Sequence, residues 1–191
     1  MQNKYLFLLG LAAITSFTSC DKDEPAAPSN EEEVITTLTI SLKDSANAAA
    51  PALVFAYKDL DGAGGNAPTV DNMTLAPNKT YLATISVADD TKTPSADITA
   101  EVKKEQNEHQ FFYFVTGLGL KSKYATTDFD TNVPSKPVGL APIFKTGANG
   151  AGILRVLLKH QPEVKKTINN TVGDETKGDT DVDVTFNFSI N

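Results

Sequence analysis

The chain has 191 residues and a formal net charge of −7, from 24 acidic and 17 basic side chains. An acidic balance of this kind argues against nucleic acid and against anionic lipid surfaces as partners. Trp is absent, which argues against a face that stacks polysaccharides on aromatic rings.

The first 19 residues have the pattern of a secretory signal. A positive charge precedes a short apolar run at 6–14, and small or hydroxylated residues lead into Cys20. The run is too short to span a bilayer, which needs roughly 20 apolar residues. Residues 17–20 read Phe-Thr-Ser-Cys and resemble the bacterial lipobox. We therefore expect residues 1–19 to be removed and Cys20, the only cysteine, to carry the lipid that anchors the protein to a membrane.

Residues 20–33 are rich in Asp, Glu, Pro and Ser. Such a segment buries too little apolar surface to fold, so it predicts a tether between the lipid and the domain. Its block Lys22-Asp23-Glu24 resembles the acidic export signal of Bacteroidota surface lipoproteins. The alternative is that these charges only solvate the tether. We expect a lipid-anchored outer-membrane protein exposed at the cell surface.

The remaining part, residues 34–191, suits one domain. Polar and apolar residues alternate from Thr180 to Ile190, which is typical of a half-buried strand. Similar patterns between Gly-, Asn- and Pro-rich turns predict strands at 34–42, 52–57, 80–88, 110–116, 121–127, 138–144 and 153–159. About eight short strands at this spacing predict an all-β fold, an antiparallel immunoglobulin-like β-sandwich.

One short helix is expected at 95–106. It follows Pro94, with Ser95 as a candidate N-cap and Asp97 in the first turn. Its apolar residues are few, so we expect the helix to cover one end of the sandwich.

Two histidines and nearby carboxylates form a candidate metal site. Glu105 and His109 are four residues apart, so a helix that extends to His109 places them on one face. His160 opens a loop after a predicted strand. Imidazole and carboxylate groups bind divalent metals such as zinc. The alternatives are a haem held between the histidines and solvated loop residues without a ligand.

Asp59 and Asp61 lie in the Gly-rich segment 59–66. Alternating carboxylates in such a loop can bind Ca²⁺. However, Ala63 stands where a third carboxylate is wanted, and Asp and Gly are also the residues that tight turns favour. The segment therefore has two interpretations, a metal loop and a simple turn.

The sequence lacks the G-x-S-x-G elbow, the phosphate loop, the dinucleotide fingerprint and the C-x-x-C pair. We therefore predict a protein that is not an enzyme.

Asp44-Ser45-Ala46 resembles the acceptor motif of Bacteroidota O-glycosylation. Ser45 lies in a predicted turn of an exported domain, where it would be accessible to modification.

Four stretches resemble a family of small Bacteroidota outer-membrane lipoproteins of unknown function. They are residues 57–68, 108–113, 154–162 and 178–186. Members are often classified as having a type 1 periplasmic-binding fold, which alternates long helices with parallel strands. With one candidate helix, this chain favours the all-β prediction. The resemblance implies partnership with a TonB-dependent outer-membrane receptor.

Two functions follow as expectations. The first is a lipid-anchored binding or accessory protein that presents a small nutrient or a metal to a TonB-dependent receptor. The alternative is a structural or adhesive surface lipoprotein with no small-molecule ligand.

Overall fold

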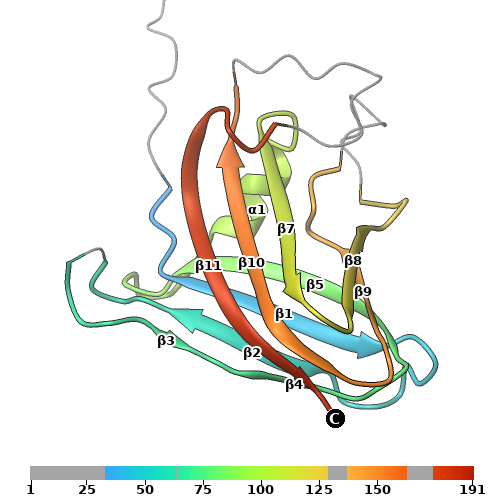
Figure 1. Cartoon of the computed structure of the whole chain (residues 1–191). Coiled ribbons are helices and arrows are strands. Elements are labelled where there is room, and N and C mark those ends of the chain that lie inside the picture. Colours follow the sequence, from blue (N-terminus) through green and yellow to red (C-terminus); the bar gives the residue numbers. More distant parts are fainter. Residues whose placement is uncertain (1–32, 63, 129–136, 163–173) are drawn as a thin grey trace, which may run out of the picture. The chain divides into compact units, whose positions relative to one another are not determined.

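The computed structural model describes residues 33–62, 64–128, 137–162 and 174–191, which form two β-sheets and one helix (Figure 1). Sheet A has the order β3 (Thr69–Val70), β2 (Leu53–Lys58), β1 (Thr37–Asp44), β5 (Thr80–Asp89), β9 (Pro142–Thr146) and β8 (Leu120–Tyr124), with β6 (Ala96–Asp97) paired to β5. Sheet B has the order β4 (Met73–Leu75), β11 (Asp179–Ile190), β10 (Gly150–His160) and β7 (His109–Gly117). The predicted all-β sandwich is confirmed.

The strands pair almost entirely in antiparallel fashion. Among the described strands, β4 and β11 alone run parallel, with Met73 opposite Phe188. The chain passes from sheet A to sheet B between β3 and β4, through Asp71 and Asn72. This short crossover brings the two sheets together at one end of the sandwich.

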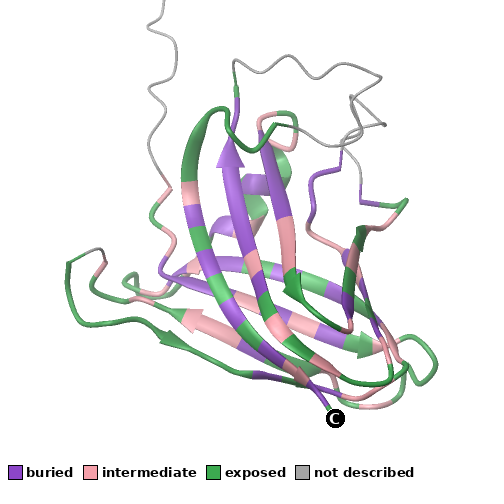
Figure 2. Cartoon of the chain, in the orientation of Figure 1, coloured by how far each residue is buried: buried purple, intermediate pink, exposed green. Residues whose placement is uncertain are grey.

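The core lies between the sheets and follows the alternation of the strands. Along β11 the buried side chains are Val182, Val184, Phe186, Phe188 and Ile190, as the sequence predicts. Figure 2 shows this alternation of buried and exposed positions on β11. Leu154, Val156 and Leu158 of β10 are fully buried beside them, so β10 is the central strand of the core.

The helix α1 (Ile98–Lys104) is shorter than the predicted segment 95–106. Its N-cap is Asp97, whose Oδ1 accepts a hydrogen bond from the Ala100 N–H at 3.3 Å. The prediction of Ser95 as the cap was wrong, because the Ser95 hydroxyl donates to Asp90 Oδ1 at 2.7 Å instead. Buried Ile98 and Val102 pack the helix against the core.

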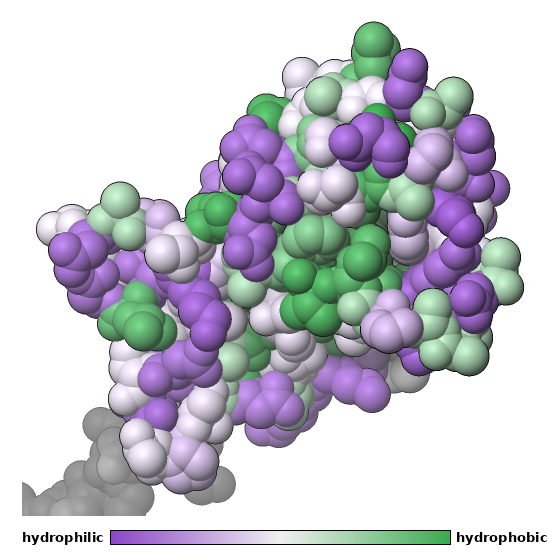
Figure 3. All heavy atoms as spheres, turned by 90° about the horizontal axis from the view of Figure 1, so that it is seen from below, coloured by the Kyte–Doolittle hydropathy of each residue, from purple (hydrophilic) through white to green (hydrophobic). Residues whose placement is uncertain are grey.

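Some apolar side chains remain at the surface. Figure 3 shows hydrophobic side chains gathered among hydrophilic ones on the side of the domain seen from below. The large exposed apolar residues include Val54 on β2 and Leu82 on β5, which are 58% and 51% exposed.

Truncation in the core should cost the most stability at a fully buried aromatic ring. Phe186 is 0% exposed and lies opposite Leu154 of β10. We expect Phe186→Ala to lower the free energy of unfolding by about 3–5 kcal/mol in denaturant titrations. Thr185→Ala, a change at the exposed neighbouring position, should stay within about 0.5 kcal/mol. Equal effects of the two substitutions would contradict the assignment of Phe186 to the buried face of β11 and of Thr185 to its exposed face.

Candidate metal centre

The two histidines meet at one end of sheet B. β7 begins at His109 and β10 ends at His160, and the antiparallel register places them directly opposite each other. Their rings stack with centroids 4.6 Å apart and planes inclined by 16°. His109 is 1% and His160 7% exposed. Strand pairing therefore brings together two residues that are 51 positions apart in the chain.

His109 is oriented by the turn that follows α1. The helix ends at Lys104, so Glu105 and His109 do not share a helical face as predicted. Instead, the Glu105 carbonyl accepts the His109 backbone N–H at 3.1 Å and lies 3.3 Å from its Nδ1. A proton on Nδ1 would complete this second hydrogen bond, and we assign the tautomer on that basis. Nε2 then faces the opposite side of the ring.

Two carboxylates lie on that opposite side. The distances from His109 Nε2 to Glu33 Oε2 and to Asp181 Oδ2 are both 3.7 Å. Asp181 reaches this position through an irregularity: Leu158 pairs with Val182 and Lys159 with Thr180, which leaves Asp181 as the extra residue. A bulge of this kind re-aims a side chain out of the strand's alternation.

The site carries several negative charges in a partly buried position. Burial raises the pKa of Glu33 to about 7, and repulsion by Asp181, Glu101 and Glu105 adds to the increase. The Oε2 atom of Glu33 is buried and makes no hydrogen bond with the described residues. An ionised Glu33 is therefore costly here unless a positive charge compensates it.

Donor atoms converge in two sets that share His109. One set is Glu105, His109 and His160, and the other is Glu33, His109 and Asp181; within each set the donor atoms lie within 4.8 Å of one another. Small side-chain rotations would bring such donors to the roughly 3.3 Å separation of tetrahedral zinc ligands.

The stacking of the imidazoles favours the second set. A metal lies in the plane of each imidazole that binds it, about 2.0–2.1 Å from the nitrogen. Nearly parallel planes, with centroids 4.6 Å apart, do not intersect near either nitrogen. The two histidines therefore do not share one ion in this arrangement. Glu33, His109 and Asp181 have no such conflict, and we refer to these three residues as the carboxylate–histidine site.

His160 and Glu105 surround this site rather than complete it. His160 stacks on His109, and its Nε2 lies 3.2 Å from Glu108 Oε2. Glu105 contributes its backbone carbonyl to His109 Nδ1. Hydrogen bonding of the second ring nitrogen to a carbonyl is the usual way in which a metal-binding histidine is held in orientation.

The other predicted site residues lie elsewhere. Asp59 Oδ1 accepts the Gly62 N–H at 3.0 Å, and Asp61 Oδ2 accepts the Asn66 N–H at 2.8 Å, so both carboxylates bond within their own turn. Neither belongs to a group of metal-ligand donors in the described residues. Ser45 is exposed in the turn after β1. Cys20 and the segments 1–19 and 20–32 lie outside the described residues.

Sequence reasoning missed Glu33 and Asp181. Glu33 falls at the end of the expected tether, yet its side chain is only 13% exposed against His109. Asp181 fits the polar phase of an alternating strand, and only the bulge with β10 reveals its position. The pair of carboxylates would have been found only from the three-dimensional arrangement.

No protein-family model, curated protein or solved structure matches the chain. Within the described residues, no helix has the length and apolar character needed to cross a bilayer. The interpretation of the site therefore depends on its own geometry.

The raised pKa of Glu33 makes stability depend on pH. Because the pKa of Glu33 is about 7 in the folded protein, against 4.5 for an ordinary glutamate side chain, the folded state keeps a proton that the unfolded state loses between these values. The free energy of unfolding should then fall as pH rises from about 4.5 to about 7. We expect Glu33→Gln to remove a decrease on the order of 2 kcal/mol, which is about 1.4 kcal/mol per pKa unit reduced for solvent screening of the partly exposed carboxyl group. Denaturation at several pH values with a chelator present measures it. Parallel pH profiles for the variant and the wild type would show that Glu33 is not perturbed.

Proposed function

We propose that the protein is a lipid-anchored envelope protein that binds a divalent transition metal through Glu33, His109 and Asp181. One observation supports this proposal above all: three metal-ligand donors from separate parts of the chain lie within 4.8 Å of one another in a partly buried site. Metal binding would also compensate the carboxylate charge that burial makes costly there.

The ligand chemistry favours zinc or a similar borderline ion. One imidazole nitrogen and two carboxylate oxygens suit such metals, whereas Ca²⁺ prefers oxygen ligands alone. Three protein ligands leave a fourth position for water or for a ligand from another protein. An ion held in this way is exchangeable, which fits delivery of a nutrient better than a closed structural site.

The position of Glu33 connects the site to the proposed anchor. Glu33 directly follows the acidic, Pro- and Ser-rich segment that we expect to tether the domain to Cys20. A metal bound by Glu33, His109 and Asp181 would fix the end of that tether against sheet B. We propose that the protein presents the ion to a TonB-dependent outer-membrane receptor, as the family resemblance implies.

Zinc binding should depend on the carboxylate–histidine site and not on the second histidine. We expect the wild-type protein to bind one zinc ion per chain in calorimetric titration. His109→Ala and Asp181→Asn should weaken binding by at least about tenfold, which corresponds to 1.4 kcal/mol. His160→Ala should bind within a few-fold of the wild type, because its ring does not point at the same ion.

Asp183→Asn is the matched control for Asp181→Asn. Asp183 lies on the same strand, two residues away, and pairs with Arg155 on the exposed face. Its substitution should leave zinc affinity unchanged. Retention of full affinity by Asp181→Asn, or a loss with His160→Ala as large as with His109→Ala, would refute the proposed ligand set. A wild-type chain that binds no metal would favour the structural surface protein instead.

The anchor and the receptor are tested together on native membranes. The tagged chain, purified from outer membranes in mild detergent, should bring a TonB-dependent receptor in near-stoichiometric amount. Cys20→Ser, which removes the sulfur that would carry the lipid, should move the chain from the membrane fraction to the soluble fraction. Recovery of the wild-type chain without a receptor would argue against the accessory role, and an unchanged distribution of the variant would argue against the lipid anchor.

A further inference from the structure

The outer face of sheet A is basic over four of its strands. Along β1, β5, β9 and β8 every second side chain points away from the core, and none of these outward residues is Asp or Glu. We call the following outward residues the basic face: Lys43, Leu82, Lys121, Lys123, Ile143 and Lys145. All four lysines and Leu82 are exposed, and Ile143 is half-buried.

The strand register places these residues in two adjacent rows. In the first row, Lys43 pairs with Leu82, Leu82 with Ile143 and Ile143 with Lys123. With strands about 4.8 Å apart, this row spans roughly 14 Å. In the second row, Lys145 lies opposite Lys121. An apolar centre is therefore flanked by ammonium groups on both sides.

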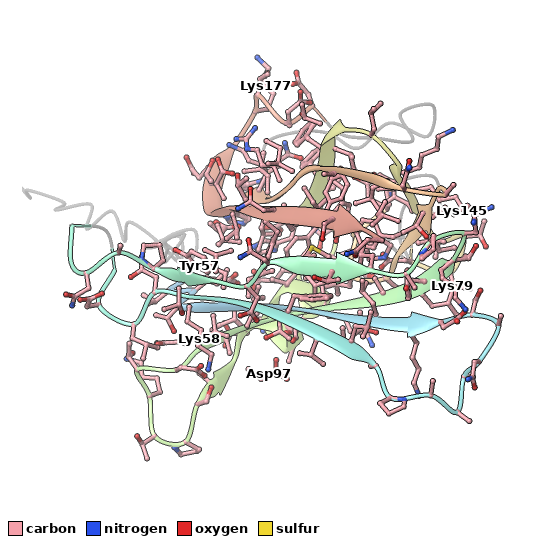
Figure 4. The ribbon with its side chains drawn as sticks, turned by 60° about the horizontal axis from the view of Figure 1, so that its bottom comes forward. Tyr57, Lys58, Lys79, Asp97, Lys145 and Lys177 are labelled. Atoms are coloured by element: carbon pink, nitrogen blue, oxygen red, sulfur yellow. The ribbon has the colours of Figure 1, made fainter. Side chains whose placement is uncertain are left out.

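Within the described residues, the lysines of this face form no ion pair with Asp or Glu. In the described part of the chain, the lysine and arginine side chains in ion pairs with Asp or Glu are those of Lys58, Lys79, Lys92 and Arg155. Figure 4 shows Lys145 at the same end of the sheet as Lys79, and Lys58 toward the other end. Like charges directly opposite each other on paired strands, as in Lys121 and Lys145, are destabilising.

A small hollow adjoins this pair. It has a volume of about 250 Å³ and is lined by Lys121 and Lys145 together with Gly119, Leu120, Thr146 and Gly147. An anionic group placed between the two ammonium groups would relieve their repulsion.

Net charge alone argues against an anionic partner, since the chain carries −7. The fold separates these charges, however: Glu33, Glu105 and Asp181 cluster about the first residue of β7, whereas none of the outward residues of β1, β5, β9 and β8 is acidic. Glu175 lines a hollow beside Lys123. Salt screens exposed charges beyond about 8 Å at physiological ionic strength. At contact distance, the basic face therefore acts through its own lysines.

We propose that the basic face docks on an anionic, phosphate-bearing lipid surface, that of the membrane to which the chain is anchored. The proposal draws on the Cys20 anchor and is independent of the metal centre. A 14-residue tether, residues 20–33, reaches at most about 50 Å, so the anchor keeps this surface within range. Leu82 and Val54, 51% and 58% exposed, provide apolar contact, and each lysine near an anionic surface strengthens binding about fivefold.

The test uses vesicles and a chain without the anchor. The mature chain from residue 20 with Cys20→Ser is co-sedimented with vesicles of equal parts phosphatidylcholine and phosphatidylglycerol, and with phosphatidylcholine alone. We expect binding to the anionic vesicles only, decreasing as salt increases. Adding Lys121→Glu and Lys145→Glu should weaken this binding by at least about twentyfold. The matched control instead carries Lys103→Glu and Lys104→Glu on α1. Both lysines are exposed, and these substitutions change the net charge by the same amount as Lys121→Glu and Lys145→Glu.

Each outcome is decisive for the docking surface. Loss of vesicle binding with Lys121→Glu and Lys145→Glu, together with unchanged binding with Lys103→Glu and Lys104→Glu, would establish the basic face as the docking surface. Equal losses would show that only net charge matters, and no binding by the parent chain would assign the face to a different partner, such as an acidic protein surface. Either of these results overturns the proposal. Because acylation is absent from all the chains compared, these results do not depend on whether Cys20 is acylated or whether the metal site binds.

Discussion

Strand β10 is paired on both sides, with β7 and with β11, and its inward residues Leu154, Val156 and Leu158 have no exposed surface. Because side chains alternate between faces, a shift of one residue in either pairing would turn these residues toward solvent. The buried core thus fixes the register, and the register places His160 opposite His109. The same constraint that stabilises the sandwich positions the histidine pair at its end.

The candidate metal centre lies where this regular pairing breaks down. The bulge between β10 and β11 directs Asp181 toward His109, and Glu33 approaches the same nitrogen from outside the sheet. Neither contact follows from core packing. Burial, and after it repulsion by the neighbouring carboxylates, raises the pKa of Glu33 and so opposes its ionisation. Departures from local consistency of this kind are expected at functional sites, where a ligand compensates the cost.

The strands and the sandwich could be predicted because alternation in the sequence reports directly on a half-buried sheet, as in Thr180 to Ile190. The proximity of Glu105 to His109 was predicted for the wrong reason, since α1 ends at Lys104 and a turn forms the contact. Asp181 could not be identified, because a bulge depends on both strands. Glu33 could not be identified either, because it directly follows a segment whose composition predicts an unfolded tether. The basic face likewise requires the register of four strands, which composition does not reveal.

In the proposed metal centre, one imidazole and two carboxylates bind the same ion, and the stacked second imidazole does not. X-ray absorption at the zinc edge of a stoichiometric zinc complex tests this claim directly. We expect a shell of nitrogen and oxygen ligands at about 2.0–2.1 Å, with multiple scattering from a single imidazole. Scattering from two imidazoles would contradict it, because His109 and His160 would then have to unstack and bind the same ion.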